Sequence, residues 1–334
     1  MVLAAYFANW SIYSKNYLPD QLPLDVLTHV IYAFFKPNAK TGSVELSDPW
    51  SDVEIKLPSN QLGCINEFHR LQELPENNFK LLLSVGGYTY SPDLTAIFTD
   101  STKRHTFVES IVALVCKYKF DGVDVDWEYP ESKKHGDIYV TLLKELRSGL
   151  DSINPELQLS VAAPAGKHVL ENMNLPAMDK YLSFWNVMTY DFAGGWSPKV
   201  AYSSNLYGEY PSGQSVIEYY TRYVRRNKIN LGISLYKLTF PNAYKLRGKF
   251  SGTPVQTALS LSNNTTGLYD SEYGCAYDIG QDVFECFDNA ESIKNKAIYC
   301  RKVGLLGAFF WDGSADLRGR DSLIRRFNEE LKLK

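Results

Sequence analysis

Short runs of apolar and β-branched residues recur along the chain, and most are followed by a segment with helical spacing of its apolar positions. Several of these runs are nearly continuous in hydrophobic residues, which is typical of parallel strands covered by helices on both faces. Strands are predicted at residues 3–8, 28–35, 80–85, 122–127, 157–163, 183–189, 229–235 and 305–311. Helices are predicted at residues 103–118, 137–152, 212–227, 289–303 and 321–332.

This alternation of eight strands with helices predicts an α/β fold, the closed (β/α)8 TIM barrel, rather than an open doubly wound sheet. The connections at residues 38–67 and 240–288 are longer than the fold requires, and long insertions in a barrel usually lie on the side of the active site. No internal repeat, linker or low-complexity tract divides the sequence. We therefore expect one barrel domain over residues 1–334.

Composition and charge narrow the classes of partner. The 334 residues are 45% hydrophobic and carry a net charge of −3, which argues against a nucleic-acid partner because phosphate binding needs clustered positive charge. No apolar stretch approaches the roughly 20 residues that cross a bilayer, so no membrane partner is expected. The N-terminal residues lack the features of a secretory signal. The chain as given is therefore expected inside the cell, or outside it if a leader has been removed.

The numbers of cysteine and of aromatic residues do not settle the disulfide pattern or the kind of ligand. Five cysteines at scattered spacings give no readable disulfide framework. The 23 Tyr, 17 Phe and 6 Trp residues fit either a large aromatic core or a cleft lined for flat, partly apolar ligands such as sugar rings. Composition alone does not choose between these two interpretations.

The segment most informative about chemistry is Phe120-Asp121-Gly122-Val123-Asp124-Val125-Asp126-Trp127-Glu128-Tyr129-Pro130. Alternate residues of a strand share a face, so Asp124, Asp126 and Glu128 point one way and the apolar residues between them point the other. In a barrel these acids would line the interior, with Glu128 at the C-terminal rim. Three carboxyl groups so close together share protons, which suits Glu128 as a general acid beside Asp126.

The acidic segment has two other interpretations. An exposed acidic face on an edge strand conflicts with the surrounding α/β pattern. A divalent-metal site would fit the Asp-x-Asp-x-Glu spacing, but the sequence has no further clustered acids or paired histidines. The five histidines show no ligand spacing, so we expect no metal and no organic cofactor.

The residues from Asp121 to Glu128 resemble the Asp-Gly-x-Asp-x-Asp-x-Glu signature of glycoside hydrolase family 18, the chitinases and their relatives. Three further segments are similar to motifs of the same family, and together they spread over the whole chain. They are Ser84-Val85-Gly86-Gly87, Met188-Thr189-Tyr190-Asp191 and Gly307-Ala308-Phe309-Phe310-Trp311.

This resemblance implies a chitinase that acts on β-1,4-linked N-acetylglucosamine, in chitin or its oligosaccharides, as a monomer. The family uses the substrate's own acetamido group as the nucleophile and retains configuration. The resemblance assigns the general acid to Glu128, the residue that orients the acetamido N–H to Asp126, and its proton-sharing neighbour to Asp124. Tyr190 would donate a hydrogen bond to the acetamido oxygen, and Asp191 would support the neighbouring network.

The resemblance also suggests residues that bind the sugar. Trp311 would pack beneath it, and Trp196 would stack on it. Met188, Tyr6 and Phe34 lie near strand ends where the family lines its cleft, although ordinary packing of the barrel explains each of these three as well.

The sequence departs from the family pattern in two places. Lys237-Leu238 follows Tyr236 where relatives often have Gly-Arg, so a substrate-binding arginine is missing, and Ala193 stands where many have histidine. The insertion at residues 240–288 also looks too short for the full insertion domain, so it is expected to be short or absent and the cleft shallow, which favours endo-type cleavage.

Two alternative functions remain at this stage. An endo-β-N-acetylglucosaminidase acting on N-glycans would share the motif and the mechanism. A chitin-binding lectin would keep the barrel, but such relatives usually lose the acid at the position of Glu128.

Overall fold

The computed structural model describes residues 1–333 and contains eight parallel strands, β1, β2, β4, β5, β6, β7, β8 and β14, with helices between them. The fold is the predicted TIM barrel, with a small antiparallel sheet inserted. Every strand predicted from the sequence overlaps one of these eight. No helix within residues 1–333 is long and apolar enough to span a membrane.

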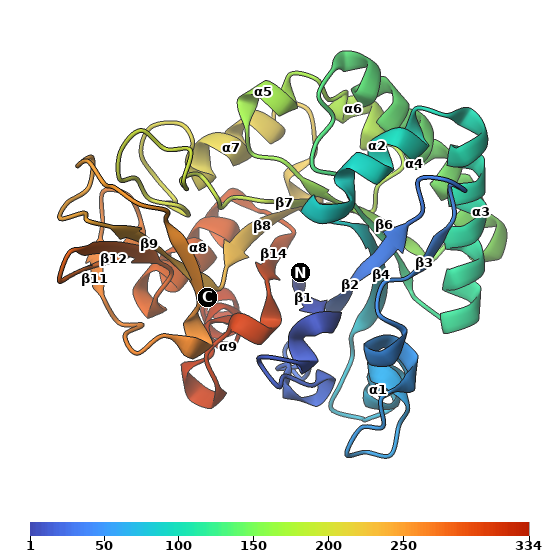
Figure 1. Cartoon of the computed structure of the whole chain (residues 1–334), viewed down its shortest axis with the longest axis horizontal. Coiled ribbons are helices and arrows are strands. Elements are labelled where there is room, and N and C mark those ends of the chain that lie inside the picture. The colour runs from blue at the N-terminus through green and yellow to red at the C-terminus, as the bar shows by residue number, and fades with distance from the viewer. Residues whose placement is uncertain (334) are drawn as a thin grey trace. The chain divides into compact units, whose positions relative to one another are not determined.

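The chain divides into two compact units, Val2–Asn186 and Val187–Lys334 with Met1. One catalytic domain over residues 1–334 stays a prediction. In the first unit, β1 pairs in parallel with β2, and the remaining strands follow in the order β2, β4, β5, β6, with the short β3 antiparallel to β2. Helices α2, α3 and α4 lie along β4, β5 and β6 (Figure 1).

The strands of the first unit are β1 (Val2–Ala8), β2 (His29–Pro37), β3 (Val44–Leu46), β4 (Lys80–Gly86), β5 (Gly122–Asp126), β6 (Gln158–Ala163) and β7 (Phe184–Val187), which ends at the boundary. Its helices are α1 (Gly63–Gln72), α2 (Ser91–Phe98), α3 (Ser101–Tyr118), α4 (Lys133–Ile153), α5 (Lys167–Leu170) and α6 (Leu175–Met178). Local chemistry fixes their ends. Asp100, for example, caps α3 by accepting hydrogen bonds from the backbone N–H groups of Thr102 and Lys103.

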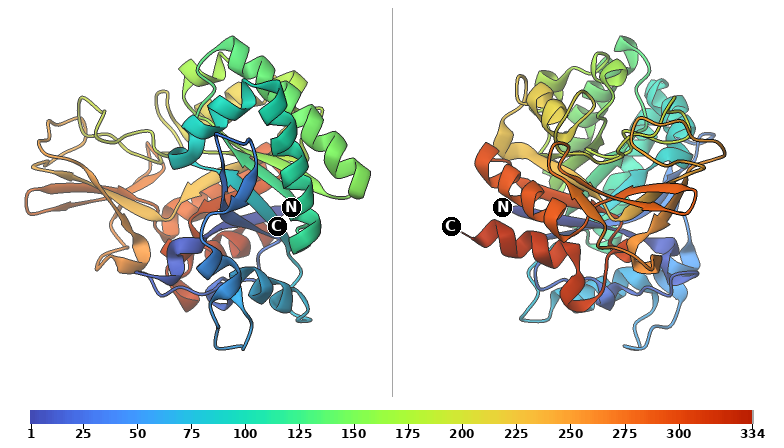
Figure 2. Two further views of the ribbon diagram at one scale, coloured as in Figure 1. Left: turned by 45° about the vertical axis from the view of Figure 1, so that its right-hand side comes forward. Right: turned by 90° about the vertical axis from the view of Figure 1, so that its left-hand side faces the viewer.

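The second unit contains α7 (Gly213–Tyr220), β8 (Ile229–Ser234), α8 (Ala290–Val303), β14 (Gly307–Trp311) and α9 (Leu323–Lys332). Strands β8 and β14 pair in parallel, and α8 and α9 lie side by side (Figure 2). Helix α7 is shorter than the predicted 212–227. After Tyr220 the chain tightens into a turn in which the Tyr223 N–H donates to the Tyr220 carbonyl. The aromatic and β-branched residues of this stretch favour helix only weakly.

The insertion after β8 is present and small. Strands β9 (Tyr236–Pro241), β10 (Val255–Ala258), β11 (Leu268–Asp270), β12 (Cys275–Gly280) and β13 (Val283–Phe287) form one antiparallel sheet in the order β10, β9, β13, β12, β11 (Figure 2). Between Tyr236 and Phe287, all of which is described, the insertion contains no α-helix. The prediction that it is short is therefore confirmed.

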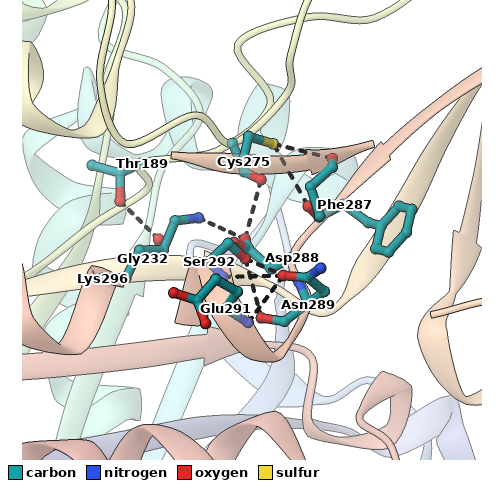
Figure 3. A network of polar contacts seen from close by, with 11 residues as sticks. Thr189, Gly232, Cys275, Phe287, Asp288, Asn289, Glu291, Ser292 and Lys296 are labelled. Atoms are coloured by element: carbon teal, nitrogen blue, oxygen red, sulfur yellow. Dashed lines mark hydrogen bonds and ion pairs between the residues drawn. The ribbon is translucent and has the colours of Figure 1, made fainter. Parts of the chain in front are cut away.

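A buried ion pair fastens the end of the insertion sheet to α8. The Lys296 Nζ lies 2.6 Å from Asp288 Oδ2, and both side chains are almost wholly buried. The hydroxyl groups of Ser292 and Ser204 also donate to Asp288, at 2.7 and 3.1 Å (Figure 3 shows Ser292 and Lys296 around Asp288). Both oxygens of the Asp288 carboxyl group therefore have buried partners at the point where β13 leads into the helix.

Candidate active site

The acidic side chains of β5 lie on the face of the strand that points away from the helices. Trp127, between Asp126 and Glu128 in the sequence, is buried, and its indole N–H donates to Thr95 Oγ1 in α2 at 2.9 Å. Its ring also packs against Phe98 of α2. Because Trp127 faces the helices, strand alternation places Asp126 on the opposite face, as predicted.

Asp124 is completely buried and accepts four hydrogen bonds. The hydroxyl groups of Tyr6 and Ser84 donate to Oδ2 at 2.9 and 2.8 Å. The Ser160 hydroxyl and the Asn186 amide donate to Oδ1 at 2.6 and 3.4 Å. Burial raises the pKa of Asp124, and these four donors oppose the rise. A carboxyl group surrounded by donors on both oxygens is best satisfied as the ionised form.

Strand register explains why these donors meet at Asp124. Ser84 of β4 and Ser160 of β6 are the direct partners of Asp124 on the two neighbouring strands. Ser160 and Asn186 are not among the site residues predicted from the sequence. A signal was present, because each is a polar residue between two apolar neighbours, in Leu-Ser-Val and Trp-Asn-Val respectively.

Asp126, the next acid along the strand, has a different environment. It is also buried, and within residues 1–333 its Oδ1 atom has no hydrogen-bond partner. Burial raises the pKa of Asp126 well above its ordinary value, and the charges of Glu128 and Asp124 raise it further. The carboxyl group therefore holds a proton readily and has one oxygen ready to accept a hydrogen bond.

The backbone at Glu128 is held by the chain that follows β4. The Glu128 N–H donates to Ser91 Oγ at 2.7 Å, and the Ser91 hydroxyl donates to the Gly87 carbonyl at 3.0 Å. The Gly87 N–H in turn donates to the Asp126 carbonyl at 2.9 Å. Gly86 has a φ of 112°, and a Cβ there would lie 2.2 Å from the Asp126 carbonyl oxygen. Glycine is therefore required for the close approach.

Two histidines of this unit, His29 and His69, have structural partners. His29 lies between Thr28 and Gln158, 2.8 and 2.7 Å from their side-chain oxygens, and His69 Nε2 lies 2.7 Å from the Tyr118 carbonyl. Burial lowers the pKa of His29 to about 4. Within residues 1–333 no group of three His, Cys, Asp or Glu side chains could hold a metal ion. A reaction without metal or organic cofactor stays a prediction.

In the second unit, Asp191 forms the centre of another polar cluster. It has a φ of 55°, and its Oδ1 accepts hydrogen bonds from the Tyr236 hydroxyl at 2.5 Å and the Gln256 amide at 2.9 Å. Although Asp191 as a whole is exposed, burial of its carboxyl group raises its pKa, and both hydrogen bonds oppose that rise. Gln256, which lies 65 residues away along the chain, is not among the site residues predicted from the sequence.

The other predicted site residues of the second unit differ in exposure. Tyr190 is buried, with its ring edge-on to Phe309 at 6.0 Å. Met188 is half-buried, and Trp311 is half-buried at the end of β14. Trp196 is 70% exposed.

In the first unit, Tyr6 and Phe34 are both buried. Tyr6 is 1% exposed and uses its hydroxyl to hold Asp124. Phe34 packs at 6.0 Å from Trp10, which is 45% exposed. Of these aromatic residues, Trp10 has the greater surface open to a ligand.

This chain is similar to known proteins both in sequence and in fold. The model of the family described as "Glycosyl hydrolases family 18" matches residues 2–316. "Endochitinase 1" of Metarhizium robertsii is 32% identical, over 99% of this chain and 85% of that protein. "Sporulation-specific chitinase 2" of Saccharomyces cerevisiae is 32% identical, over 99% and 78%. The crystal structure of the group IV chitinase of Ostrinia furnacalis is 25% identical, with a TM-score of 0.88 and 99% of each chain covered.

Proposed function

This chain belongs to glycosyl hydrolase family 18, and from that premise we propose that it is a chitinase which cleaves β-1,4 linkages between N-acetylglucosamine units with retention of configuration. The names of its relatives, endochitinase and chitinase, support this substrate. The presence of Glu128 together with both aspartates supports hydrolysis over binding alone. The prediction of a chitinase-like glycosidase is confirmed at the level of the family.

The observation that carries the proposed mechanism is the buried Asp126 Oδ1 atom, which has no partner within residues 1–333. An unpartnered buried acceptor is costly unless a ligand supplies the donor. The N–H of a substrate acetamido group is such a donor. Bound to Asp126, the acetamido group would be oriented with its carbonyl oxygen toward the anomeric carbon.

The reaction then has two steps. Glu128 gives its proton to the glycosidic oxygen, the bond from that oxygen to the anomeric carbon breaks, and the acetamido oxygen forms the new bond, which gives an oxazolinium ion. The negative charge that the coupled carboxyl groups of Asp126 and Asp124 share stabilises the positive charge on the nitrogen of the oxazolinium ring. Water then attacks the anomeric carbon, Glu128 takes its proton, and the acetamido group is restored. Two inversions give net retention.

The remaining predicted residues take supporting parts in this proposal. Tyr190 donates a hydrogen bond to the acetamido oxygen, and Trp311 and Trp196 pack on sugar rings. We propose that Tyr6 acts through Asp124 and not through the sugar, because its hydroxyl already donates to that carboxylate. Contacts of Phe34 and Met188 with substrate stay predictions.

We also propose endo-type cleavage by a monomer. The small insertion, which has no α-helix between Tyr236 and Phe287, leaves little material to wall a closed cleft. The name of the Metarhizium relative agrees with this mode of action. A product profile dominated from the outset by dimers released from chain ends would exclude it.

The test is incubation with N-acetylglucosamine oligosaccharides, followed over time by product analysis and by NMR of the anomers. We expect β-anomers first, loss of turnover but retained binding in Glu128→Gln, and no cleavage of fully deacetylated oligosaccharides. Equal cleavage of deacetylated substrate would refute participation of the acetamido group. Preference for a high-mannose glycoprotein would instead favour the N-glycan activity.

A further inference from the structure

The polar cluster around Asp191 includes a side chain, that of Gln256, with unused capacity both to donate and to accept hydrogen bonds. Tyr236 is buried, and its single hydroxyl proton is donated to Asp191. Gln256 is exposed and uses only one of its two amide hydrogens on the same carboxylate oxygen. Within residues 1–333 no other hydrogen bond is made by its side chain. One N–H and the carbonyl oxygen of Gln256 are therefore open to solvent.

The sheet fixes the direction in which this amide points. Gln256 lies on β10, the edge strand of the insertion, directly opposite Leu238 of β9. Residues directly opposite in an antiparallel pair share a face, and Tyr236, two residues before Leu238, shares it as well. The hydrogen bonds of Tyr236 and Gln256 to Asp191 agree with this placement. Val255, the neighbour of Gln256, lies on the other face.

The face of β9 that carries Tyr236 has no charged side chain directly opposite Gln256. Leu238, at that position, is apolar and buried. Lys237 points to the other face, where its Nζ lies 2.7 Å from Glu285 Oε2. The neutral carboxamide of Gln256 is thus a group beside Asp191 that is able to donate to a ligand.

We propose that Gln256 is a substrate-binding residue, which holds Asp191 through one N–H and presents its second N–H and its carbonyl oxygen to an N-acetylglucosamine unit. The chemistry matches, because the hydroxyl and acetamido groups of this sugar each pair with a group that both donates and accepts. A guanidinium only donates. The inference rests on the proposed function and adds to it a binding residue specific to this chain.

The test compares Gln256→Met, which keeps the size of the side chain and removes its hydrogen bonds, with Val255→Thr. Val255 is 56% exposed on the same edge strand and serves as the matched control. For a series of N-acetylglucosamine oligosaccharides we expect KM to rise about three- to tenfold in Gln256→Met, with kcat changed less than about twofold. Val255→Thr should keep both constants. An unchanged KM in Gln256→Met at every chain length would overturn the proposal, as would an equal rise in Val255→Thr.

A second variant keeps the inference testable if Gln256→Met is poorly folded. Gln256→Glu retains an acceptor but places a second carboxylate beside Asp191, which should raise KM most at the alkaline end of the pH range. An unchanged KM across that range would also overturn the proposal.

Binding separates this inference from the proposed function. Calorimetric titration of the same oligosaccharides into Glu128→Gln, with and without Gln256→Met, should show the same three- to tenfold loss of affinity. A wild-type chain inactive on every oligosaccharide would refute the chitinase. An active wild type with unaltered Gln256→Met would refute only the assignment of Gln256.

Discussion

Removing the Tyr6 hydroxyl tests whether Asp124 is held as an ionised group by its donors. Tyr6→Phe keeps the buried ring of a residue that is 1% exposed and deletes only the oxygen that donates to Asp124 Oδ2 at 2.9 Å. Ser84 remains as a donor to that oxygen at 2.8 Å. The substitution therefore changes one hydrogen bond to a completely buried carboxylate and leaves the packing of β1 in place.

The magnitude follows from the charge of the acceptor. A hydrogen bond to a charged group contributes about 1.5–3 kcal/mol, and one pKa unit corresponds to about 1.4 kcal/mol. Tyr6→Phe should therefore destabilise the ionised form of Asp124 by about 1.5–3 kcal/mol and raise its pKa further. The wild type gains this stability only while Asp124 is ionised. The difference in unfolding free energy is thus present at high pH and is lost as pH falls through the pKa of Asp124.

The assay is urea unfolding together with kcat/KM on N-acetylglucosamine oligosaccharides across pH, with Tyr32→Phe as the matched control. Tyr32 is equally buried, and its hydroxyl donates to another buried carboxylate, Asp52, at 2.6 Å. Both variants should lose similar stability near neutral pH. Only Tyr6→Phe should move the acid limb of kcat/KM, by up to about one unit upward, because the acids of β5 titrate as a coupled set. Superimposable pH profiles for the two variants would refute this account of Asp124.

Three other substitutions test the supporting contacts. Ser91→Ala removes the acceptor of the Glu128 N–H, so kcat should fall about tenfold while KM changes little. A change in KM as large as the fall in kcat would count against a positioning role for Ser91. Lys296→Met leaves Asp288 buried without its cation, and urea unfolding should show a loss of about 3–5 kcal/mol that Asp288→Leu in the same chain partly restores. Burial lowers the pKa of His29 from 6.5 to about 4, so the free energy of unfolding of the wild type should fall by about 3 kcal/mol as pH falls across that interval. In His29→Gln this pH dependence of the free energy of unfolding should disappear. If it persists, another group causes the sensitivity to acid.

The eight strands and the orientation of the acids were predictable because both depend on local pattern. A parallel strand buried on both faces is a continuous apolar run, and the predicted 80–85 differs from the observed Lys80–Gly86 by one residue. Alternation then separates Asp124 and Asp126 from Trp127 without knowledge of any partner. The residues that cap the helices were harder to predict from the sequence. The end of α7 was predicted too far along the chain, because its apolar spacing continues beyond Tyr220 into a turn.

The partners of the site residues could not be predicted in the same way, because they depend on register and on distant chain segments. Ser160 meets Asp124 only when the two strands are aligned at those residues. Gln256 meets Asp191 only once the insertion has folded into a sheet with β10 at its edge. Such contacts have no periodicity along the sequence. For Ser160, the available sign of a functional role was its place as a polar residue between apolar neighbours in a strand.

The four donors to Asp124 also connect the chemistry of this unit to its fold. They come from β1, β4, β6 and β7, so four strands must be in register for the carboxylate to be satisfied. A shift of one residue in any of these strands turns its donor to the other face and leaves a buried charge less well partnered. The state of ionisation of Asp124, and through coupling that of Asp126, therefore depends on the alignment of the strands themselves. Substitutions that loosen this part of the barrel should alter the pH dependence of cleavage even where they lie far from the sugar.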